Sequence, residues 1–273
     1  MRQLYLFSSS RLPAALRRLA LACAALVPLA AVAAPADKEG QEGEASSWGL
    51  GVAAISKQQP YAGMDRETRA LPMLSYENRW FKFAGLGAEV KLPRLGINER
   101  QSIDFRLVGR FDMSGYEADD APILNGMDER KSGFWVGAKA TWRNDIAHLS
   151  ADWSADASGH SKGQRFGLSL EKNFHLGPQM MLTPRLGAVW LDKKYVDYYF
   201  GVRSHEALAG RAAYTGKAGV NTELGLRGAY LFDRHHSMFL DVGVTRLAKQ
   251  IKNSPLVDRS TENRVLLGYL YRF

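Results

Sequence analysis

The sequence predicts an all-β protein: a transmembrane up-and-down antiparallel β-barrel in the outer membrane of a Gram-negative cell. Three features predict this fold class: an N-terminal export signal, repeated alternation of apolar and polar residues, and a C-terminal strand that ends on phenylalanine. We expect about 12 strands, with about 10 as the alternative, because single-chain bacterial barrels have an even number.

The N-terminal segment has the character of a secretory signal peptide. Its positive n-region contains Arg2, Arg11, Arg17 and Arg18. Residues 19–34 are almost wholly apolar, and Ala31-Val32-Ala33 offers small residues at a signal-peptidase spacing. The alternative is a membrane anchor, but this run contains Pro28 and is shorter than the roughly 20 residues that a spanning helix needs. We therefore expect residues 1–34 to be the signal peptide, 35–47 a short polar periplasmic tail and 48–273 the barrel.

Composition narrows the classes of function. Cys23, the only cysteine, lies in the signal segment, so the predicted mature chain has no disulfide and no cysteine nucleophile. The net charge is +8, but loss of the four signal arginines leaves 32 basic against 28 acidic residues, a net charge of +4. Because these charges form no basic stripe, we expect no nucleic-acid partner. No apolar stretch long enough for a spanning helix follows Ala34.

From Trp48 onward, apolar and polar residues alternate with a period of two, as in strands whose faces meet different media. In residues 102–113, for example, Phe105 lies on the opposite face from Asp104 and Arg106. Strands are expected near 47–55, 67–77, 80–92, 101–111, 132–143, 145–154, 164–174, 178–192, 220–232, 236–247 and 262–273.

The phase of this alternation slips inside the stretch 80–92. The outward positions change from odd numbers, such as Phe83, to even numbers, such as Ala88. We expect either a bulge or a turn at Ala84-Gly85. A turn would divide the stretch into two strands and restore the even number that a barrel needs.

Charged residues occupy the middle of many expected strands, on the polar face that would line the lumen. The basic ones are Arg106, Arg110, Lys139, Arg143, Arg165, Arg185, Arg227, Arg264 and Arg272. The acidic ones are Asp104, Asp112, Asp152, Glu171, Glu223 and Asp241. Mixed signs on adjacent strands predict ion pairs that stiffen the wall. A narrow pore with a mild anion preference is the alternative.

The expected strand ends and connections also suit an outer-membrane barrel. Aromatic residues recur near strand ends, as interfacial girdles require: Trp48, Tyr76, Phe111, Trp142, Trp153, Phe174, Trp190 and Phe232. Short connections, such as those at 143–145, 175–178 and 233–235, should face the periplasm. Long polar connections at 112–131, 155–163, 203–219 and 248–261 should face outward.

The last strand carries Tyr269, Tyr271 and Phe273 on one face. An unpaired strand edge with ordered aromatic side chains can be recognised by strand addition. We therefore expect the barrel assembly machinery to bind this ending, and the strand then to close the barrel against residues 48–54.

The sequence presents no convincing catalytic, cofactor or metal site. His235-His236 fall in a tight turn, where adjacent side chains point apart and chelate poorly. His148, Ser150 and Asp152 share a lumen face, but i, i+2 neighbours lie ~7 Å apart, too far for a hydrogen-bonded triad. Neither Gly-x-Gly pair, at 49–51 and 85–87, precedes a helix, so a dinucleotide site is not expected. We therefore expect a protein that is not an enzyme, with a barrel-wall hydrolase as the remote alternative.

Several segments, in their order and spacing, resemble the MltA-interacting protein (MipA/OmpV) family. They are QPYAGMD at 59–65, LPMLSY at 71–76, LNGMD at 124–128, DYYFGV at 197–202, KNSPLVD at 252–258 and GYLYRF at 268–273. The resemblance covers the chain from about Trp48 to its end. One departure is Phe200, where many members carry tyrosine.

The resemblance implies an outer-membrane scaffold without enzymatic activity, surrounded by outer-membrane lipids. Such a scaffold would connect a lytic transglycosylase, which degrades murein, with a penicillin-binding protein, which synthesises it. Binding would use the periplasmic turns and the 37–47 tail. The resemblance carries no residue roles, because the family offers no catalytic motif. A narrow channel or permeability protein and an adhesin are the alternatives.

Overall fold

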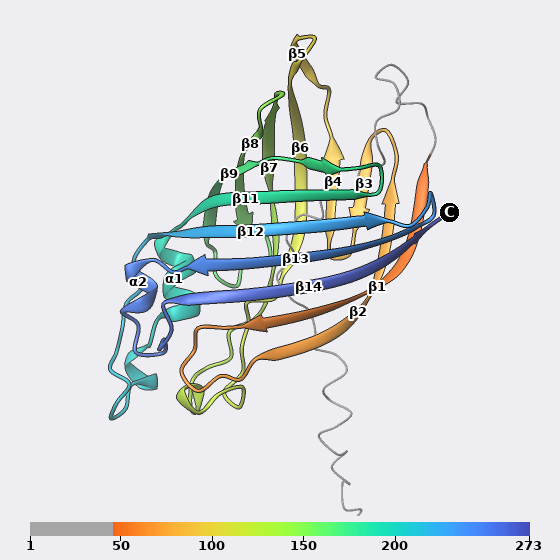
Figure 1. The fold of residues 1–273 in the computed structure, drawn as a ribbon. Coiled ribbons are helices and arrows are strands. Elements are labelled where there is room, and N and C mark those ends of the chain that lie inside the picture. Colours follow the sequence, from red (N-terminus) through yellow and green to blue (C-terminus); the bar gives the residue numbers. More distant parts are fainter. Residues whose placement is uncertain (1–45) are drawn as a thin grey trace, which may run out of the picture.

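The computed structural model describes residues 46–273; the expected signal peptide and nearly all of the expected tail lie outside them. No helix among the described residues is both long and apolar enough to cross a membrane. The chain forms a closed antiparallel barrel (Figure 1), as the sequence predicted.

Twelve strands form the wall. They are β1 (Ser47–Gln58), β2 (Glu67–Glu77), β3 (Phe81–Ala84), β4 (Gly87–Lys91), β6 (Gln101–Asp112), β7 (Gly133–Arg143), β8 (His148–Asp156), β9 (Gln164–Glu171), β11 (Met180–Leu191), β12 (Gly219–Leu231), β13 (His236–Arg246) and β14 (Thr261–Arg272). Two short strands, β5 (Leu95–Asn98) and β10 (Phe174–Leu176), pair with β6 and β11 at one end of the barrel.

The barrel closes where the sequence predicted. β14 pairs with β1 in a register that runs from Gly49 opposite Arg272 to Gln58 opposite Asn263. Beyond the strand, the Phe273 N–H donates to the Trp48 carbonyl oxygen at 2.9 Å. The last strand and the first therefore seal each other's edges, which removes the open edge that a membrane cannot solvate.

The phase slip at Ala84-Gly85 is a turn. β3 ends at Ala84, Gly85 has a φ of +59°, and β4 begins at Gly87. A left-handed φ suits glycine because it has no Cβ. The turn supplies the extra strand, so the expectation of twelve is confirmed.

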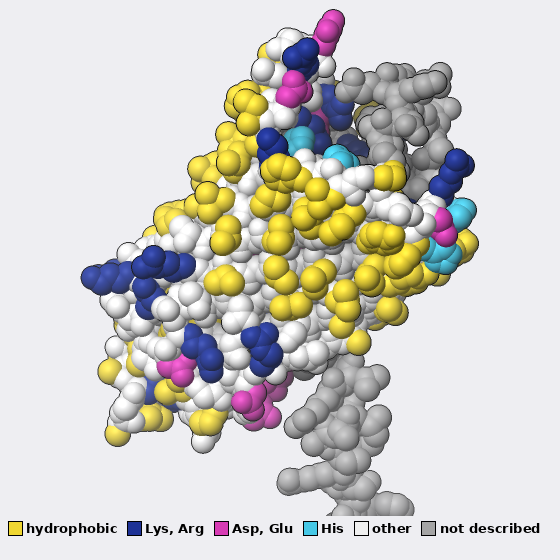
Figure 2. Space-filling model, viewed as in Figure 1, with side chains coloured by type: hydrophobic (Ala, Val, Ile, Leu, Met, Phe, Trp, Pro, Cys, Tyr) yellow, Lys and Arg dark blue, Asp and Glu magenta, His cyan; other side chains and the backbone are white. Residues whose placement is uncertain are grey.

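The two faces of the wall differ as the alternation predicted. Leu186 and Leu224 on the outer face are 58% and 65% exposed, whereas the neighbouring Arg185 is 7% exposed. Apolar side chains cover the visible wall, and charged ones gather toward its ends (Figure 2). An apolar outer band with a polar interior is the arrangement of an outer-membrane barrel.

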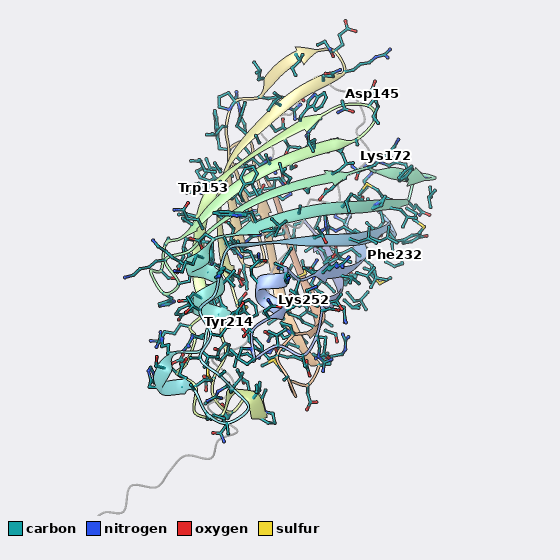
Figure 3. The ribbon with its side chains drawn as sticks, turned by 90° about the vertical axis from the view of Figure 1, so that its left-hand side faces the viewer. Asp145, Trp153, Lys172, Tyr214, Phe232 and Lys252 are labelled. Atoms are coloured by element: carbon teal, nitrogen blue, oxygen red, sulfur yellow. The ribbon has the colours of Figure 1, made fainter. Side chains whose placement is uncertain are left out.

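The two ends of the barrel differ in their connections. Figure 3 places Asp145, Lys172 and Phe232, which lie in or beside short turns, at one end, and Tyr214 and Lys252, from long connections, at the other. By the usual asymmetry the short turns face the periplasm.

The long connections fold into a cap over the outer mouth. They include the helices α1 (Lys193–Phe200) and α2 (Lys249–Lys252) and the 3₁₀ turns Pro122–Leu124 and Ser204–Glu206. Side chains from four connections and the adjoining strand ends pack in one apolar cluster, in which Leu124, Val196, Ile251 and Leu256 are fully buried. Three of these connections, 112–131, 203–219 and 248–261, were predicted from the sequence to be long and polar; in the structure they share a hydrophobic core with the β1–β2 connection.

A second apolar cluster lies inside the barrel on β1, β2, β12, β13 and β14. Its members are Ala53, Ile55, Met73, Ala229, Phe239 and Leu266. Gly268 permits this packing, because a Cβ there would lie 2.2 Å from Cζ of Phe239. One side of the lumen is therefore filled by apolar side chains, and the charged residues occupy the rest.

Candidate functional site

The most buried charges of the lumen form one cluster on β11–β14. Asp241 is fully buried, and its carboxylate accepts from Arg227 at 3.0 Å, Arg264 at 3.4 Å and Arg185 at 3.5 Å. Glu223 is shared between Arg185 at 3.1 Å and Arg264 at 3.3 Å. These carboxylates balance most of the charge of three arginines, so the cluster ties four strands together.

A second group of ion pairs lines β6–β9. Asp112 pairs with Arg165, whose guanidinium carbon lies 3.8 Å from the ring centroid of the buried Trp135. Asp104 accepts from Arg143 at 2.5 Å and from Arg94 at 2.7 Å. The prediction that lumen charges of mixed sign pair is therefore confirmed for both groups, but Asp112 on β6 and Arg165 on β9 pair across the lumen and not on adjacent strands.

A third group of ion pairs, on β2–β4 and β6, was not predicted from the sequence. Glu77 pairs with Lys91 at 2.7 Å and lies 3.8 Å from Lys82, and Glu89 accepts from Arg106 at 2.5 Å. The phase slip at Ala84-Gly85 obscured the inward face of this stretch. The signal was present in the lysine between two outward phenylalanines and in the glutamate between Ala88 and Val90.

Two cavities that share lining residues lie in the lumen. A cavity of about 280 Å³ is lined by charged side chains of both signs, including Lys139, Asp152 and Arg165. A smaller cavity of about 180 Å³ lies against the cap, beside Tyr195 and Tyr199. Arg165 and Glu223 line both cavities.

Ion pairs also hold the cap together. The Arg130 guanidinium donates to both carboxylate oxygens of the buried Glu206, at 2.7 and 2.9 Å. Arg211 donates to the backbone carbonyl oxygens of Ile123, Asn125 and Glu206. Burial opposes ionisation of Glu206, but hydrogen bonds from the Arg203 N–H, the Arg130 guanidinium and the Asp128 N–H outweigh it and lower the pKa of Glu206.

The candidate residues for chemistry do not assemble into a catalytic arrangement. Ser150 Oγ lies 2.9 Å from Thr141 Oγ1, so its described partner is another hydroxyl and not a base. His148 is paired in register with Arg143 and Glu171. His235 Nδ1 lies 2.8 Å from the Arg272 carbonyl oxygen, and His236 Nδ1 lies 2.5 Å from the Tyr269 hydroxyl. The two turn histidines thus have separate partners.

Asp128, His205 and Glu206 bring three potential metal-ligand atoms within 4.8 Å of one another. Their carboxylates are already bound by cations of the chain, because Arg203 donates to Asp128 at 2.5 Å and Arg130 binds Glu206. A divalent ion would have to displace both arginines, so this group fits an ion-pair network of the cap.

The periplasmic rim carries exposed apolar residues between two projecting turns. The β5–β6 turn and the β7–β8 turn border a groove of about 730 Å³. Ile146 at the second turn is 76% exposed, and Ile97 on β5 is 52% exposed. Both isoleucines lie beyond Trp142, whose ring is at the level of the periplasmic aromatic girdle. An ion pair between Arg100 and Asp145, at 3.9 Å, joins the two turns.

Comparison with known proteins now decides the family. The family model described as MltA-interacting protein MipA matches residues 50–273. The chain belongs to this family. It is 26% identical over 230 residues to the putative outer membrane protein YiaT of Escherichia coli K12, covering 84% of this chain and 92% of that protein. It is 25% identical over 230 residues to the MltA-interacting protein of the same strain, covering 83% and 90%.

Solved outer-membrane barrels are also among the proteins to which this MipA-family chain is similar. The NanC porin gives a TM-score of 0.46 at 12% identity, covering 81% of this chain and 98% of that one. The COG4313 outer membrane channel from Pseudomonas putida F1 gives 0.45 at 13% identity, covering 88% and 99%. The family match and the barrel fold confirm the predicted localisation in the outer membrane.

Proposed function

We propose that this protein is a non-enzymatic outer-membrane scaffold that binds a murein hydrolase of the lytic transglycosylase class and links it to a murein synthase, a penicillin-binding protein. The family description, which names an interaction with MltA, supports a murein-hydrolase partner. The observation that carries the proposal is the groove on the periplasmic rim, where murein enzymes could reach it.

The distribution of apolar and charged groups favours this surface. A cap with its own apolar core covers the outer mouth, and the charged side chains of the lumen largely form ion pairs with one another. Ile97 and Ile146, by contrast, remain exposed beyond the aromatic girdle. Contiguous exposed apolar groups with a polar rim typically mark protein interfaces.

The test is capture of murein enzymes by the mature protein after crosslinking in cell envelopes. Ile146→Asp places a charge in the groove and Ile97→Asp places one on β5 beside it; both should reduce recovery of a murein hydrolase and of a murein synthase. Leu208→Asp is the matched control, because Leu208 is 54% exposed but lies in the connection between β11 and β12, on the cap. Equal recovery with all three variants, or recovery of neither enzyme by the wild-type protein, would contradict the proposal.

The second candidate is a narrow channel, and the lumen cavity of about 280 Å³ favours it. Ions would have to pass the cap and cross a lumen lined by charges of both signs. Planar-bilayer recording separates the two functions: reproducible conductance steps support a channel, whereas a folded barrel without conductance supports the scaffold.

A further inference from the structure

The lumen cavity of about 280 Å³ is bordered by buried polar atoms that have no hydrogen-bond partner among the described residues. They are Nε1 of Trp135, Oγ of Ser154, Nε and Nη2 of Arg165, and Nε of Arg264. Trp135 and Ser154 are only 1% and 3% exposed. Buried polar groups in proteins are nearly always hydrogen-bonded, so several unpartnered ones around a single cavity require an explanation.

Three of these side chains lie together because their strands are neighbours. Trp135 and Gly137 both face the lumen from β7, and Gly137 lies opposite Ser154 on β8. Ser154 in turn lies opposite Arg165 on β9. The Arg165 guanidinium covers the Trp135 ring, with its central carbon 3.8 Å from the ring centroid. The indole, the hydroxyl and the guanidinium therefore form one patch on the lumen wall, which we name the donor patch.

The ion pair of Arg165 uses only part of its guanidinium. Nη1 donates to the Asp112 carboxylate, whereas Nε and Nη2 have no partner among the described residues. The N–H groups on Nε and Nη2 project from the same edge of the planar guanidinium, in the fork that binds both oxygens of one carboxylate. An indole N–H and a guanidinium can only donate, and a serine hydroxyl can donate. The missing partner must therefore supply acceptor oxygens.

The charges around the cavity favour a monoanion as this partner. Six basic and five acidic side chains line the cavity, so the lining has one net positive charge. Two of the acidic residues have no described ion pair, but each lies opposite a basic residue in register: Asp152 opposite Lys139, and Glu171 opposite Arg185. A single negative charge at the donor patch would balance the lining.

Inward-facing glycines leave the space that an organic ion needs. Gly167 and Gly187 line the cavity on β9 and β11, where a larger residue would fill it. The nearest atom to a Cβ at Gly187 would lie 3.6 Å away, so the backbone does not require glycine there. The cavity is several times larger than the ~30 Å³ that one water molecule occupies in the liquid, so it can hold a small organic ion.

We propose that the donor patch binds a small organic monocarboxylate inside the barrel. The carboxylate accepts both N–H groups of the free Arg165 edge, and its oxygens also accept from the Trp135 indole and the Ser154 hydroxyl. The organic part of the ligand occupies the space beside Gly167 and Gly187. Because this site lies in the lumen, the proposal is independent of the periplasmic scaffold.

Fluorine NMR of the protein in detergent, with 5-fluorotryptophan in place of tryptophan, tests the proposal. The sequence has six tryptophans, and a Trp135→Phe variant assigns the resonance of Trp135. Propionate should shift that resonance saturably, whereas propionamide, its neutral analogue, should not. Trp153 is the internal control, because it lies on the lipid-facing side of β8 and is 45% exposed. Its resonance, assigned with Trp153→Phe, should not move.

Two variants test the assigned contacts separately. Arg165→Lys keeps a positive charge beside Asp112 but removes the fork, and should weaken propionate binding about tenfold, the loss of roughly one charge-assisted hydrogen bond. Gly187→Met fills the cavity from a position with room for a Cβ and should abolish the shift. A far-ultraviolet β signal and heat-modifiable gel mobility establish that each variant is folded.

Three results would overturn the proposal. The first is an equal shift of the Trp135 resonance by propionate and propionamide, or an equal shift of the Trp135 and Trp153 resonances by propionate. The second is tighter binding of chloride or inorganic phosphate than of propionate, which would indicate a site for inorganic anions. The third is unchanged propionate binding in a folded Arg165→Lys or Gly187→Met variant; if one variant does not fold, the other decides.

Discussion

Asp241→Asn tests the buried ion cluster of the lumen. The Asp241 carboxylate is fully buried and lies within 3.5 Å of three arginines. The asparagine amide keeps the shape of the side chain and one acceptor oxygen but removes the negative charge. Within the cluster, only Glu223 then remains to balance the charge of the three arginines. Removing one partner of a buried ion pair costs 3–5 kcal/mol, and because the asparagine still accepts a hydrogen bond we expect about 3 kcal/mol.

The measurement is the free energy of unfolding in urea, followed by tryptophan fluorescence in lipid vesicles. Asp258→Asn is the control, since Asp258 is 48% exposed and pairs with Arg259 at 3.5 Å on the cap. An exposed pair is worth under ~1 kcal/mol, so this variant should be almost as stable as the wild type. Equal losses in the two variants would refute the conclusion that lumen ion pairs stabilise the wall.

Three further predictions follow from the wall, the cap and the C-terminus. Leu226→Arg puts a charge on the lipid-facing wall and should lower the free energy of unfolding in vesicles by ~2–4 kcal/mol, whereas the lumen-facing Gly187→Ser should cost much less; equal losses would mean an incorrect register. The lowered pKa of Glu206 means that this residue stabilises the cap fully above the unfolded carboxyl pKa of ~4.3, and that the stabilisation is lost as the pH falls through the lower folded pKa. Protease accessibility of the cap should therefore rise in that acidic range in the wild type. The Glu206→Gln variant should show the higher accessibility already at neutral pH. Deletion of Phe273 should reduce outer-membrane levels in cells far more than refolding yield in detergent, and normal levels in cells would contradict recognition by the assembly machinery.

The strands of the wall could be predicted from the sequence because they follow a local pattern, the alternation of apolar and polar residues. Period-two alternation located the strands, and it placed Arg185, Arg227 and Asp241 correctly on the lumen face. Even the strand number followed from a local signal, the phase slip that Gly85 resolves as a turn.

The cap could not be predicted in this way, because its contacts join connections far apart in the chain. Leu124 and Leu256 are fully buried in one cluster, yet neither belongs to a periodic segment.

Specific side-chain contacts within the lumen also could not be predicted from local sequence patterns. From the sequence, Gly225 and Gly187 are equivalent lumen-facing glycines. A Cβ at Gly225 would lie 2.6 Å from the Arg185 guanidinium and disturb the ion cluster, whereas the nearest atom to a Cβ at Gly187 lies 3.6 Å away. Gly187 is therefore the better control position.

Photo-crosslinking in living cells tests the proposed scaffold role most directly. A photoreactive amino acid at Ile97, on β5 beside the periplasmic groove, should yield an adduct that contains a murein hydrolase. The same amino acid at Leu208, on the cap, should yield no such adduct. A folded protein at normal outer-membrane levels that gives no hydrolase adduct at position 97, or equal adducts at both positions, would contradict the account.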